Sequence, residues 1–460
     1  MKAGFFKGSG LVAGLLSAQI FVAIFYGATI FFLSSSGDIS NPNIPMEVKA
    51  SKDLFWAFVV FGLFFLTFCI YRVRAPRAMF LYTLVPLLLF LLDLWISIYK
   101  FEIDSEHLGI LKNYAMFYFG GGVLVILADR FDAQYTLFTS FRLFMTISVL
   151  IGLGFYLLPG ESQVSYVYFG RMIATLANPN MLGYLCALHL MLLHGVVYYY
   201  GRLSRLEMLE MCVAVAGLIA SVSLAAILVF AVAVVLLAAL VALRIFPRSG
   251  ALLKLVGVEL AVGLVTLSVF VWIITAMDAL SDLNLLYSKA YLLLTSPMDP
   301  EVSTSVVARV ETFDLVREEV LGSWNGFLFG SSQFGEYIKW DSALVNLLLN
   351  YGFFSFALWF SFFSLPVVVT FASRRLLKRH LSQDVCFVFV LSVFLLSSLT
   401  THFWLQYAPE TYPTSFFLGW IMAFIMFHVY SVRATHRDSE KWVPEAPLEN
   451  LAFSKQPAST

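Results

Sequence analysis

The sequence predicts an all-α integral membrane protein, a bundle of about twelve helices that each cross the bilayer. The chain of 460 residues is 60% hydrophobic and only 13% charged, with a mean hydropathy of +0.84. A chain of this composition needs lipid around it. Apolar stretches of the length that a bilayer requires, roughly 20 residues, make up more than half of the chain, so the membrane bundle is the protein.

The expected spans follow these apolar stretches along the chain. They are 11–33, 54–70, 79–99, 110–128, 143–158, 179–199, 208–224, 225–243, 252–277, 342–371, 385–399 and 414–430. The stretch 110–128 contains three consecutive glycines, 143–158 is short, and 208–224 runs into 225–243 with almost no turn. Together they predict one bundle over residues 1–430, followed by a flexible polar tail at 431–460.

Basic residues predict the orientation of the bundle, because loops on the cytoplasmic side collect Lys and Arg. With the first residue inside, 20 of the 29 basic residues lie in inner segments, whereas 18 of the 29 carboxylates lie in outer loops. Both termini are therefore expected in the cytoplasm. The largest outer loop, about 278–341, contains apolar residues from Val306 to Val320 at helical spacing, which predicts an amphipathic helix that lies on the membrane surface or caps the bundle.

Composition also excludes several classes of function. The net charge is zero and no basic patch is present, so a nucleic-acid partner is excluded. The chain has no Walker motif, no zinc-ligand spacing, no nucleophile elbow and no Asp-rich motif in an outer loop, which implies chemistry without a metal or cofactor, or none. Asp93 and Glu259, the carboxylates that lie well inside predicted spans, are few for an ion-coupled transporter.

The segment 169–184, FGRMIATLANPNMLGY, is the most informative stretch for function. Asn178 is a favoured N-cap and Pro179 a favoured first helical residue, so a helix is expected to start there at the outer face. Its first N–H groups and its dipole, with Asn180 in the first turn and Arg171 upstream, predict an anion site suited to pyrophosphate. An ordinary capped helix with an interfacial arginine that binds a lipid headgroup explains the same residues.

Two further arginines belong to the amphipathic segment of the outer loop. Arg309 and Arg317 fall on opposite sides of the expected helix, and Arg309, near its start, is the one expected to reach a phosphate. Arg317 is also a candidate for binding substrate, although a salt bridge with Glu311, Asp314 or Glu318 is the expected fate of its charge.

The outer titratable candidates for acid–base chemistry are Asp341, His402 and Glu410. A carboxylate or imidazole there can accept the proton of a sugar hydroxyl or hold that hydroxyl by a hydrogen bond. Asp341 precedes an expected span, however, and helix capping alone explains its position equally well.

Four segments in the same order resemble a known family. They are NPNMLGYL at 178–185 after Arg171, SVSLAA at 221–226, Arg309 followed by Gly330, and WDSALVNLLLNYGFFSFALWF at 340–360. This ordered set resembles the bacterial O-antigen polymerase and O-antigen ligase superfamily over roughly residues 110–430.

The resemblance implies an inner-membrane glycosyltransferase with a GT-C-like helical architecture. Its substrate would be an oligosaccharide linked to undecaprenyl pyrophosphate, used at the periplasmic face without a metal, with a flippase and a chain-length regulator as further partners. Arg171 and Arg309 would correspond to the two outer-loop arginines of the family, which are proposed to hold the donor pyrophosphate and the glycan. A fixed guanidinium stabilises the charge of such a leaving group.

Two departures from the family pattern bear on the activity. Asp341 and Ser342 stand where ligases typically carry a His-Asn pair, which favours a polymerase, and Ser223 and Leu224 stand where the family has Ser-Arg. The alternatives are an O-antigen ligase that transfers glycan to lipid A core or protein, and, from another class, a glycolipid flippase or other transporter.

Overall fold

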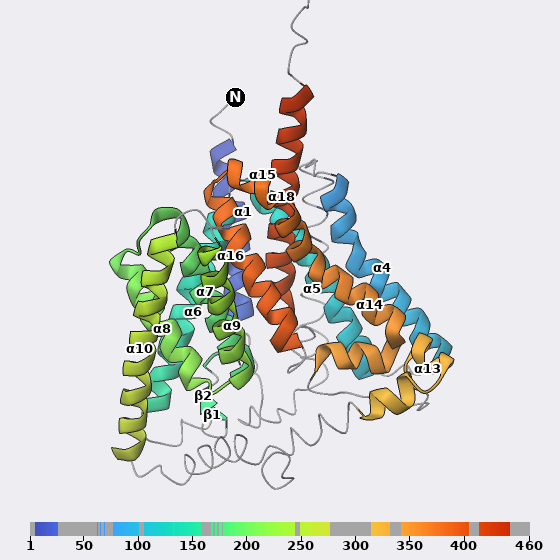
Figure 1. Ribbon diagram of the computed structural model, residues 1–460, viewed down its shortest axis with the longest axis horizontal. Coiled ribbons are helices and arrows are strands. Elements are labelled where there is room, and N and C mark those ends of the chain that lie inside the picture. The colour runs from blue at the N-terminus through green and yellow to red at the C-terminus, as the bar shows by residue number, and fades with distance from the viewer. Residues whose placement is uncertain are drawn as a thin grey trace, which may run out of the picture.

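The computed structural model describes residues 5–25, 77–100, 105–131, 133–157, 167–168, 171–172, 174–176, 178–243, 249–276, 314–331, 342–403 and 414–441, with the single positions 62, 65 and 69. Across these residues the chain is a bundle of helices with one very short hairpin (Figure 1). Seven of the described helices are long and apolar enough to cross a membrane. The prediction of an all-α membrane bundle is therefore confirmed at this level, whereas about twelve spans stays a prediction.

The elements follow one another in a simple order. They are α1 (Phe5–Ile24), α4 (Arg77–Lys100), α5 (Ser105–Arg130), α6 (Gln134–Leu157), β1 (Val167–Tyr168), β2 (Arg171–Met172), α7 (Pro179–Tyr200), α8 (Arg205–Ala220), α9 (Leu224–Ala242), α10 (Ser249–Ala276), the π-helical η3 (Val316–Val320), α13 (Trp324–Phe329), α14 (Ala343–Ala372), α15 (Arg374–Arg379), α16 (Gln383–Ser397), the π-helical η4 (Ser398–His402) and α18 (Thr414–Lys441).

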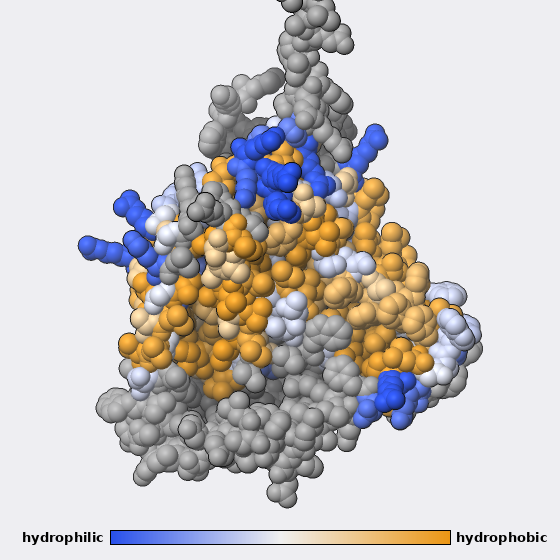
Figure 2. Space-filling view, in the orientation of Figure 1, coloured by the Kyte–Doolittle hydropathy of each residue, from blue (hydrophilic) through white to orange (hydrophobic). Residues whose placement is uncertain are grey.

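The two ends of the bundle can be told apart by the segments that lie there. Helix α1 begins and α18 ends at one end, which we call the terminal end, whereas α7 begins at the opposite end, which we call the loop end (Figure 1). Hydrophilic side chains gather at the terminal end, and a broad apolar belt surrounds the middle of the visible face (Figure 2). The basic helix α15, with Arg374, Arg375, Lys378 and Arg379, belongs to the terminal end. A belt of this kind is the surface that lipid tails cover.

Helix α7 is the most enclosed of the spanning helices. In its most apolar window 94% of the residues are buried, against 33% in α9, which exposes apolar side chains such as Val235. It packs on α8, α9, α10 and α16. The segment that the sequence marks as most informative for function therefore leads into the centre of the bundle.

Three consecutive glycines allow α5 to pack closely on its neighbours. The helix runs through them without a break from Ser105 to Arg130. A Cβ atom on Gly121 would lie 2.5 Å from the backbone carbon of Gly419 in α18, and one on Gly122 would lie 2.7 Å from the side chain of Thr83 in α4. Small residues are what close approach of membrane helices requires, so these glycines belong to the packing of α5.

Helix α14 is broken near its loop end. Gly352 has φ 78° and ψ 177°, outside helical geometry. The carbonyl groups that the break leaves free find other donors: Lys100 Nζ donates to Asn350 O at 3.1 Å, and the Ser331 N–H donates to Leu349 O at 2.6 Å. The first part of α14 is thus a separate short helix that is held by Lys100 of α4 and by Ser331, which follows α13.

We expect Gly352→Ala to destabilise the protein by about 2–3 kcal/mol. Its backbone angles are essentially accessible only to glycine, and a Cβ there would lie 2.6 Å from the backbone of Leu328. Thermal unfolding in detergent measures the effect. Gly154→Ala is the matched control, since a Cβ at Gly154 has nothing within 4 Å and alanine favours a helix. Equal melting temperatures for the two variants would contradict the proposed constraint.

Asp93 is buried within α4 and has two donors from α14. The Ser355 hydroxyl donates to Oδ1, and the Trp359 indole N–H donates to Oδ2 at 2.7 Å. A carboxylate inside a membrane is costly unless it is paired or hydrogen-bonded. Asp93 therefore joins α4 to the second part of α14, which is a structural role.

The predicted start of the flexible tail at 431 is wrong, because α18 continues through Lys441. The segment 431–441 contains no glycine or proline, and the first proline after it is Pro444, so nothing in this sequence stops the helix. The helix that contains the predicted span 143–158 also extends beyond it, since α6 begins at Gln134. Loss of hydrophobicity marks the edge of the membrane, and a helix can continue past it.

Candidate functional site

The helix start predicted at Asn178 is confirmed. Asn178 has extended backbone angles and caps α7, Pro179 is the first helical residue, and the Asn178 side chain accepts the backbone N–H of Asn180 at 2.8 Å. Both asparagines are half-buried. The first turn of α7 and the positive end of its dipole thus lie at the loop end of the bundle (Figure 1).

A second helix starts beside the first. Ser223 caps α9 by accepting the N–H of Ala226, and its hydroxyl donates to Oδ1 of Asn180 at 3.0 Å. Ser221 and Ser223 are fully buried, and Val222 between them has a positive φ of 47°. We call Asn178, Asn180, Ser221 and Ser223 the asparagine–serine junction. It brings together two segments that lie more than forty residues apart in the sequence.

Gly183 permits this close contact between α7 and the turn that precedes α9. A Cβ atom at Gly183 would lie 2.7 Å from the hydroxyl of Ser221 and 2.9 Å from the Cβ of Ala226. Both neighbours are buried parts of the turn and of the first turn of α9. The glycine in the NPNMLGY segment is therefore needed where the two helix starts meet.

The end of α16 lies beside the junction, against α7 and α9. Tyr184 of α7 hydrogen-bonds to Ser398 at 3.0 Å, and Ser397 donates to the backbone carbonyl of Val229 in α9 at 2.5 Å. At Ser398 the α-helix changes to the π-helical turn η4. Single π-helical turns are frequent at functional sites, and this one ends with His402.

One hydrogen bond links the start of α14 to the end of η4. The Ser342 hydroxyl donates to the backbone carbonyl of Phe403 at 3.2 Å. Ser342 follows Asp341 in the chain, and Phe403 follows His402. The two predicted acid–base candidates thus flank residues that are in direct contact, although Asp341 and the side chain of His402 lie outside the described residues.

Arg171 lies in a short hairpin at the loop end. Its strand β2 pairs antiparallel with β1, Tyr168 opposite Arg171. The chain between this hairpin and α7 is attached to the bundle by Met172, which is fully buried, and by Thr175, whose hydroxyl donates to the Ile24 carbonyl at 2.8 Å. The backbone of Arg171 is therefore placed shortly before the start of α7, while its side chain lies outside the described part.

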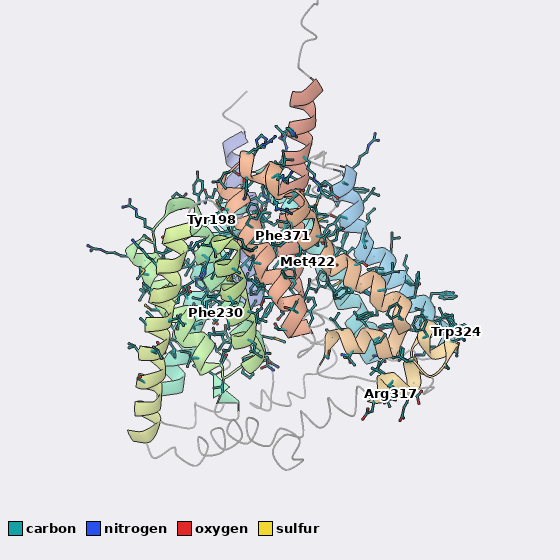
Figure 3. The ribbon with its side chains drawn as sticks, viewed as in Figure 1. Tyr198, Phe230, Arg317, Trp324, Phe371 and Met422 are labelled. Atoms are coloured by element: carbon teal, nitrogen blue, oxygen red, sulfur yellow. The ribbon has the colours of Figure 1, made fainter. Side chains whose placement is uncertain are left out.

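The remaining candidates are described only in part. Arg309 and Glu410 lie outside the described residues. Arg317 lies on η3 at the edge of the loop end and is exposed (Figure 3), whereas Val316 and Val320 of the same turn are buried, as the amphipathic pattern predicts. No ion pair joins Arg317 to Asp314 or Glu318, which are both described, so these two expected pairings are absent.

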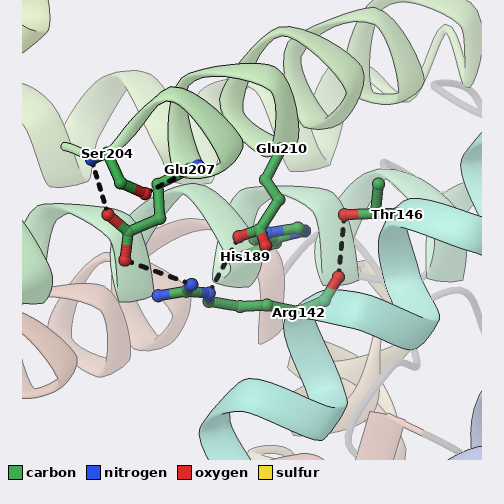
Figure 4. A network of polar contacts seen from close by, with 6 residues as sticks. All are labelled: Arg142, Thr146, His189, Ser204, Glu207 and Glu210. Carbon is green, nitrogen blue, oxygen red and sulfur yellow. Dashed lines mark hydrogen bonds and ion pairs between the residues drawn. The ribbon is translucent and has the colours of Figure 1, made fainter.

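A buried charged cluster was missed by the sequence analysis. Arg142 of α6 makes two ion pairs with α8, from Nη2 to Glu207 at 3.3 Å and from Nε to Glu210 at 2.9 Å (Figure 4). The Nε2 atom of His189, in α7, lies 3.8 Å from the same Glu210 oxygen. Glu210 and His189 interrupt apolar stretches, which is a signal in the sequence, whereas Arg142 falls one residue before the predicted span 143–158 and so is not expected inside the bundle.

This cluster also shows how α8 is started and held. Glu207 and Ser204 form a capping box, with the Glu207 carboxylate accepting the Ser204 N–H at 2.8 Å and the Ser204 hydroxyl accepting the Glu207 N–H at 3.3 Å. Glu207 therefore accepts an N–H group at the start of α8 and also forms an ion pair with Arg142. The arrangement joins α6, α7 and α8 (Figure 4), so we assign it to structure.

No family model and no curated protein matches the chain. The chemistry of the junction therefore has to be argued from its own groups. The positive dipole ends of two helices meet at the junction, which favours a negative charge nearby. The hydroxyls of Ser221 and Ser223 are buried and donate within the protein, to Leu218 O and to Asn180 Oδ1, so they hold the two helix starts together. Within the described residues no cluster of three or more His, Cys, Asp or Glu side chains is placed to hold a metal ion.

Proposed function

We propose that this protein is a polysaccharide polymerase of the O-antigen or exopolysaccharide type. It transfers a growing glycan from undecaprenyl pyrophosphate to a lipid-linked repeat unit, at the periplasmic face of a bacterial inner membrane. The observation that carries this proposal is the contact between Asn180 and Ser223. It joins two of the four segments on which the resemblance depends, and the Ser342–Phe403 hydrogen bond places the start of a third segment against η4.

The proposed orientation follows from charge. The basic helix α15 lies at the terminal end of the bundle, where α1 begins and α18 ends. Because basic residues collect on the cytoplasmic side, this end faces the cytoplasm and the loop end faces the periplasm. The asparagine–serine junction then lies at the end of the bundle that faces the side on which lipid-linked glycans are polymerised.

In the proposed reaction the acceptor hydroxyl attacks the anomeric carbon of the donor sugar. The bond from that carbon to the pyrophosphate oxygen breaks, and undecaprenyl pyrophosphate leaves with the bonding electron pair. Arg171, Arg309 and the helix starts at Asn178 and Ser223 stabilise the negative charge of the leaving group. Asp341, His402 or Glu410 takes the proton of the acceptor hydroxyl.

Deletion of the gene separates the proposal from its alternatives. A polymerase predicts that polymer is lost and that single lipid-linked repeat units accumulate. A ligase predicts that polymer is made but stays on its lipid carrier. A flippase or other transporter predicts that purified protein in vesicles moves the glycolipid across the bilayer without forming a glycosidic bond. Polymer of normal length in the deletion strain overturns the polymerase.

We expect Arg171→Ala to lower polymer formation by about 100-fold, the usual effect of removing one donor to a developing negative charge. Arg171→Lys should retain part of the activity, because it keeps the charge but loses the fixed geometry of the guanidinium. Gel analysis of chain length, with immunoblotting for protein amount, measures both. The control is Arg375→Ala, which removes an exposed arginine at the terminal end. If the Arg171→Ala variant still makes polysaccharide chains of near-normal length, Arg171 does not hold the pyrophosphate.

A further inference from the structure

A second titratable pair lies within the membrane part of the bundle, away from the proposed glycan site. His194 of α7 and Glu259 of α10 face each other with Nε2 to Oε2 at 3.3 Å. Their side chains are 0% and 4% exposed. Both carboxylate oxygens of Glu259 lack a hydrogen-bond partner with good geometry among the described groups. The deletion phenotype proposed above does not involve this pair.

The hydrogen atoms of this pair can be counted from its geometry. His194 Nδ1 lies 2.9 Å from the backbone carbonyl of Leu190, and a carbonyl only accepts, so Nδ1 carries a hydrogen. A favourable contact between Nε2 and Glu259 then needs one more proton. That proton is either on Nε2, giving an imidazolium beside a carboxylate, or on Glu259, giving a carboxylic acid that donates to Nε2. Both arrangements have a net charge of zero.

The arrangement without this proton is unfavourable. A neutral His194 with hydrogen on Nδ1 would present a lone pair to an ionised Glu259, so that two acceptors would face each other with a buried negative charge. Burying a charge without a partner is among the most costly arrangements in a protein, and more so in a bilayer. The folded pair should therefore keep this proton at pH values at which the same two side chains, free in water, have already lost it.

We propose that His194 and Glu259 form a buried proton-binding site that holds α10 against α7. The ligand is a single proton shared by the two side chains. With the proton bound, the pair is neutral and its two members attract each other across the contact between the helices. When the proton leaves, the attraction is lost and a buried carboxylate remains.

The charged groups on the neighbouring helices have partners other than His194 and Glu259, or are exposed. Helix α9, which places Phe230 beside His194, has no titratable residue (Figure 3). Arg142 of α6 and Glu210 of α8 pair with each other. Of the other charged groups, His189 faces Glu210, and Glu207 of α8 pairs with Arg142. Arg205 and Lys254 are exposed, and Asp384 of α16 faces Tyr135 and His428. The weakly acidic groups of these helices include Cys186, Cys212, Cys386, Tyr198 and Tyr184, which bonds to Ser398.

The test compares the melting temperature of the full-length protein in detergent with that of Glu259→Gln, from about pH 6 to about pH 9. The glutamine amide can donate to Nε2 of a neutral His194, so this variant needs no shared proton. The folded wild type binds more protons than its unfolded chain in this range, and its stability falls as the pH rises. We expect the melting temperature of wild type minus that of Glu259→Gln to decrease by a few degrees.

Ser392→Ala is the control, because it removes a buried hydrogen bond between α16 and α14, from Ser392 to Thr370, without changing a titratable group. This variant should lose stability about equally across the pH range. A wild-type to Glu259→Gln difference that does not change with pH, or that increases as the pH rises, overturns the proposal.

A second measurement on the wild type does not depend on whether the variant folds. Nitrogen NMR of ¹⁵N-histidine-labelled protein at about pH 8 should show one buried imidazole that holds hydrogen on Nδ1 and a second hydrogen on Nε2 or in a strong bond to it. At this pH a free histidine is neutral. The signal is assigned by its absence in His194→Asn. An ordinary neutral spectrum for His194, with no hydrogen at or bonded to Nε2, overturns the proposal.

Discussion

Gly121→Ala is expected to destabilise the bundle by about 3 kcal/mol or more and to lower the amount of folded protein in the membrane. A single methyl group at this position would lie 2.5 Å from the backbone atoms of Gly419 and Trp420 in α18. Backbone atoms cannot move aside as a flexible side chain can, so α5 and α18 have to separate. Overpacking of this kind usually costs about 1–3 kcal/mol, and a contact with backbone belongs at the upper end.

The measurement is thermal unfolding in detergent together with the yield of monodisperse protein. Gly14→Ala provides the control, because a Cβ at Gly14 in α1 meets nothing within 4 Å and alanine is the better helix former by about 1 kcal/mol. We expect Gly14→Ala to keep or raise the melting temperature. If Gly121→Ala also keeps or raises the melting temperature, α5 and α18 do not pack as closely as described.

Glu210→Leu should destabilise the protein by about 3–5 kcal/mol, the usual cost of leaving the partner of a buried ion pair without its counter-charge. Arg142 would retain only Glu207, which also caps α8 and is more exposed than Glu210. His189 would lose the carboxylate near its Nε2. The contacts that join α6, α7 and α8 would therefore weaken together (Figure 4).

A double variant gives the sharper experiment. Replacing a buried pair by apolar residues of similar size is often close to neutral, so Arg142→Met with Glu210→Leu should recover most of the stability that Glu210→Leu alone loses. Both are compared with the wild type by thermal unfolding. A double variant that is less stable than either single variant would show that the pair stabilises the bundle beyond charge compensation, contrary to this prediction.

Helices were the easiest feature to predict from the sequence. Apolar stretches of the length of a bilayer can only be satisfied by helices or closed barrels, because backbone groups have no water to bind. The start of α7 was also predictable, since Asn178 and Pro179 are chemically suited to the first positions of a helix. Boundaries set by polarity failed where a helix continues beyond the membrane, as α18 does to Lys441.

The contacts of the candidate site could not be predicted from local patterns in the sequence. Asn180 and Ser223 were each visible in a segment of interest, but their hydrogen bond depends on how α7 packs against the turn before α9. The break of α14 is similar. Gly352 is one of 28 glycines in the chain, and only the positions of Lys100 and Ser331 show that the carbonyls near it have donors outside the helix.

The sequence alone determined that this is a helical membrane protein and approximately where most of the described helices lie, because hydrophobicity and capping act over short distances along the chain. It did not determine which polar side chains meet. Arg142 with Glu210, His194 with Glu259, and Asn180 with Ser223 come from different helices. A pairing across helices depends on how each helix is rotated and packed, and that is decided by close contacts of residues such as Gly121 and Gly183 with distant parts of the chain.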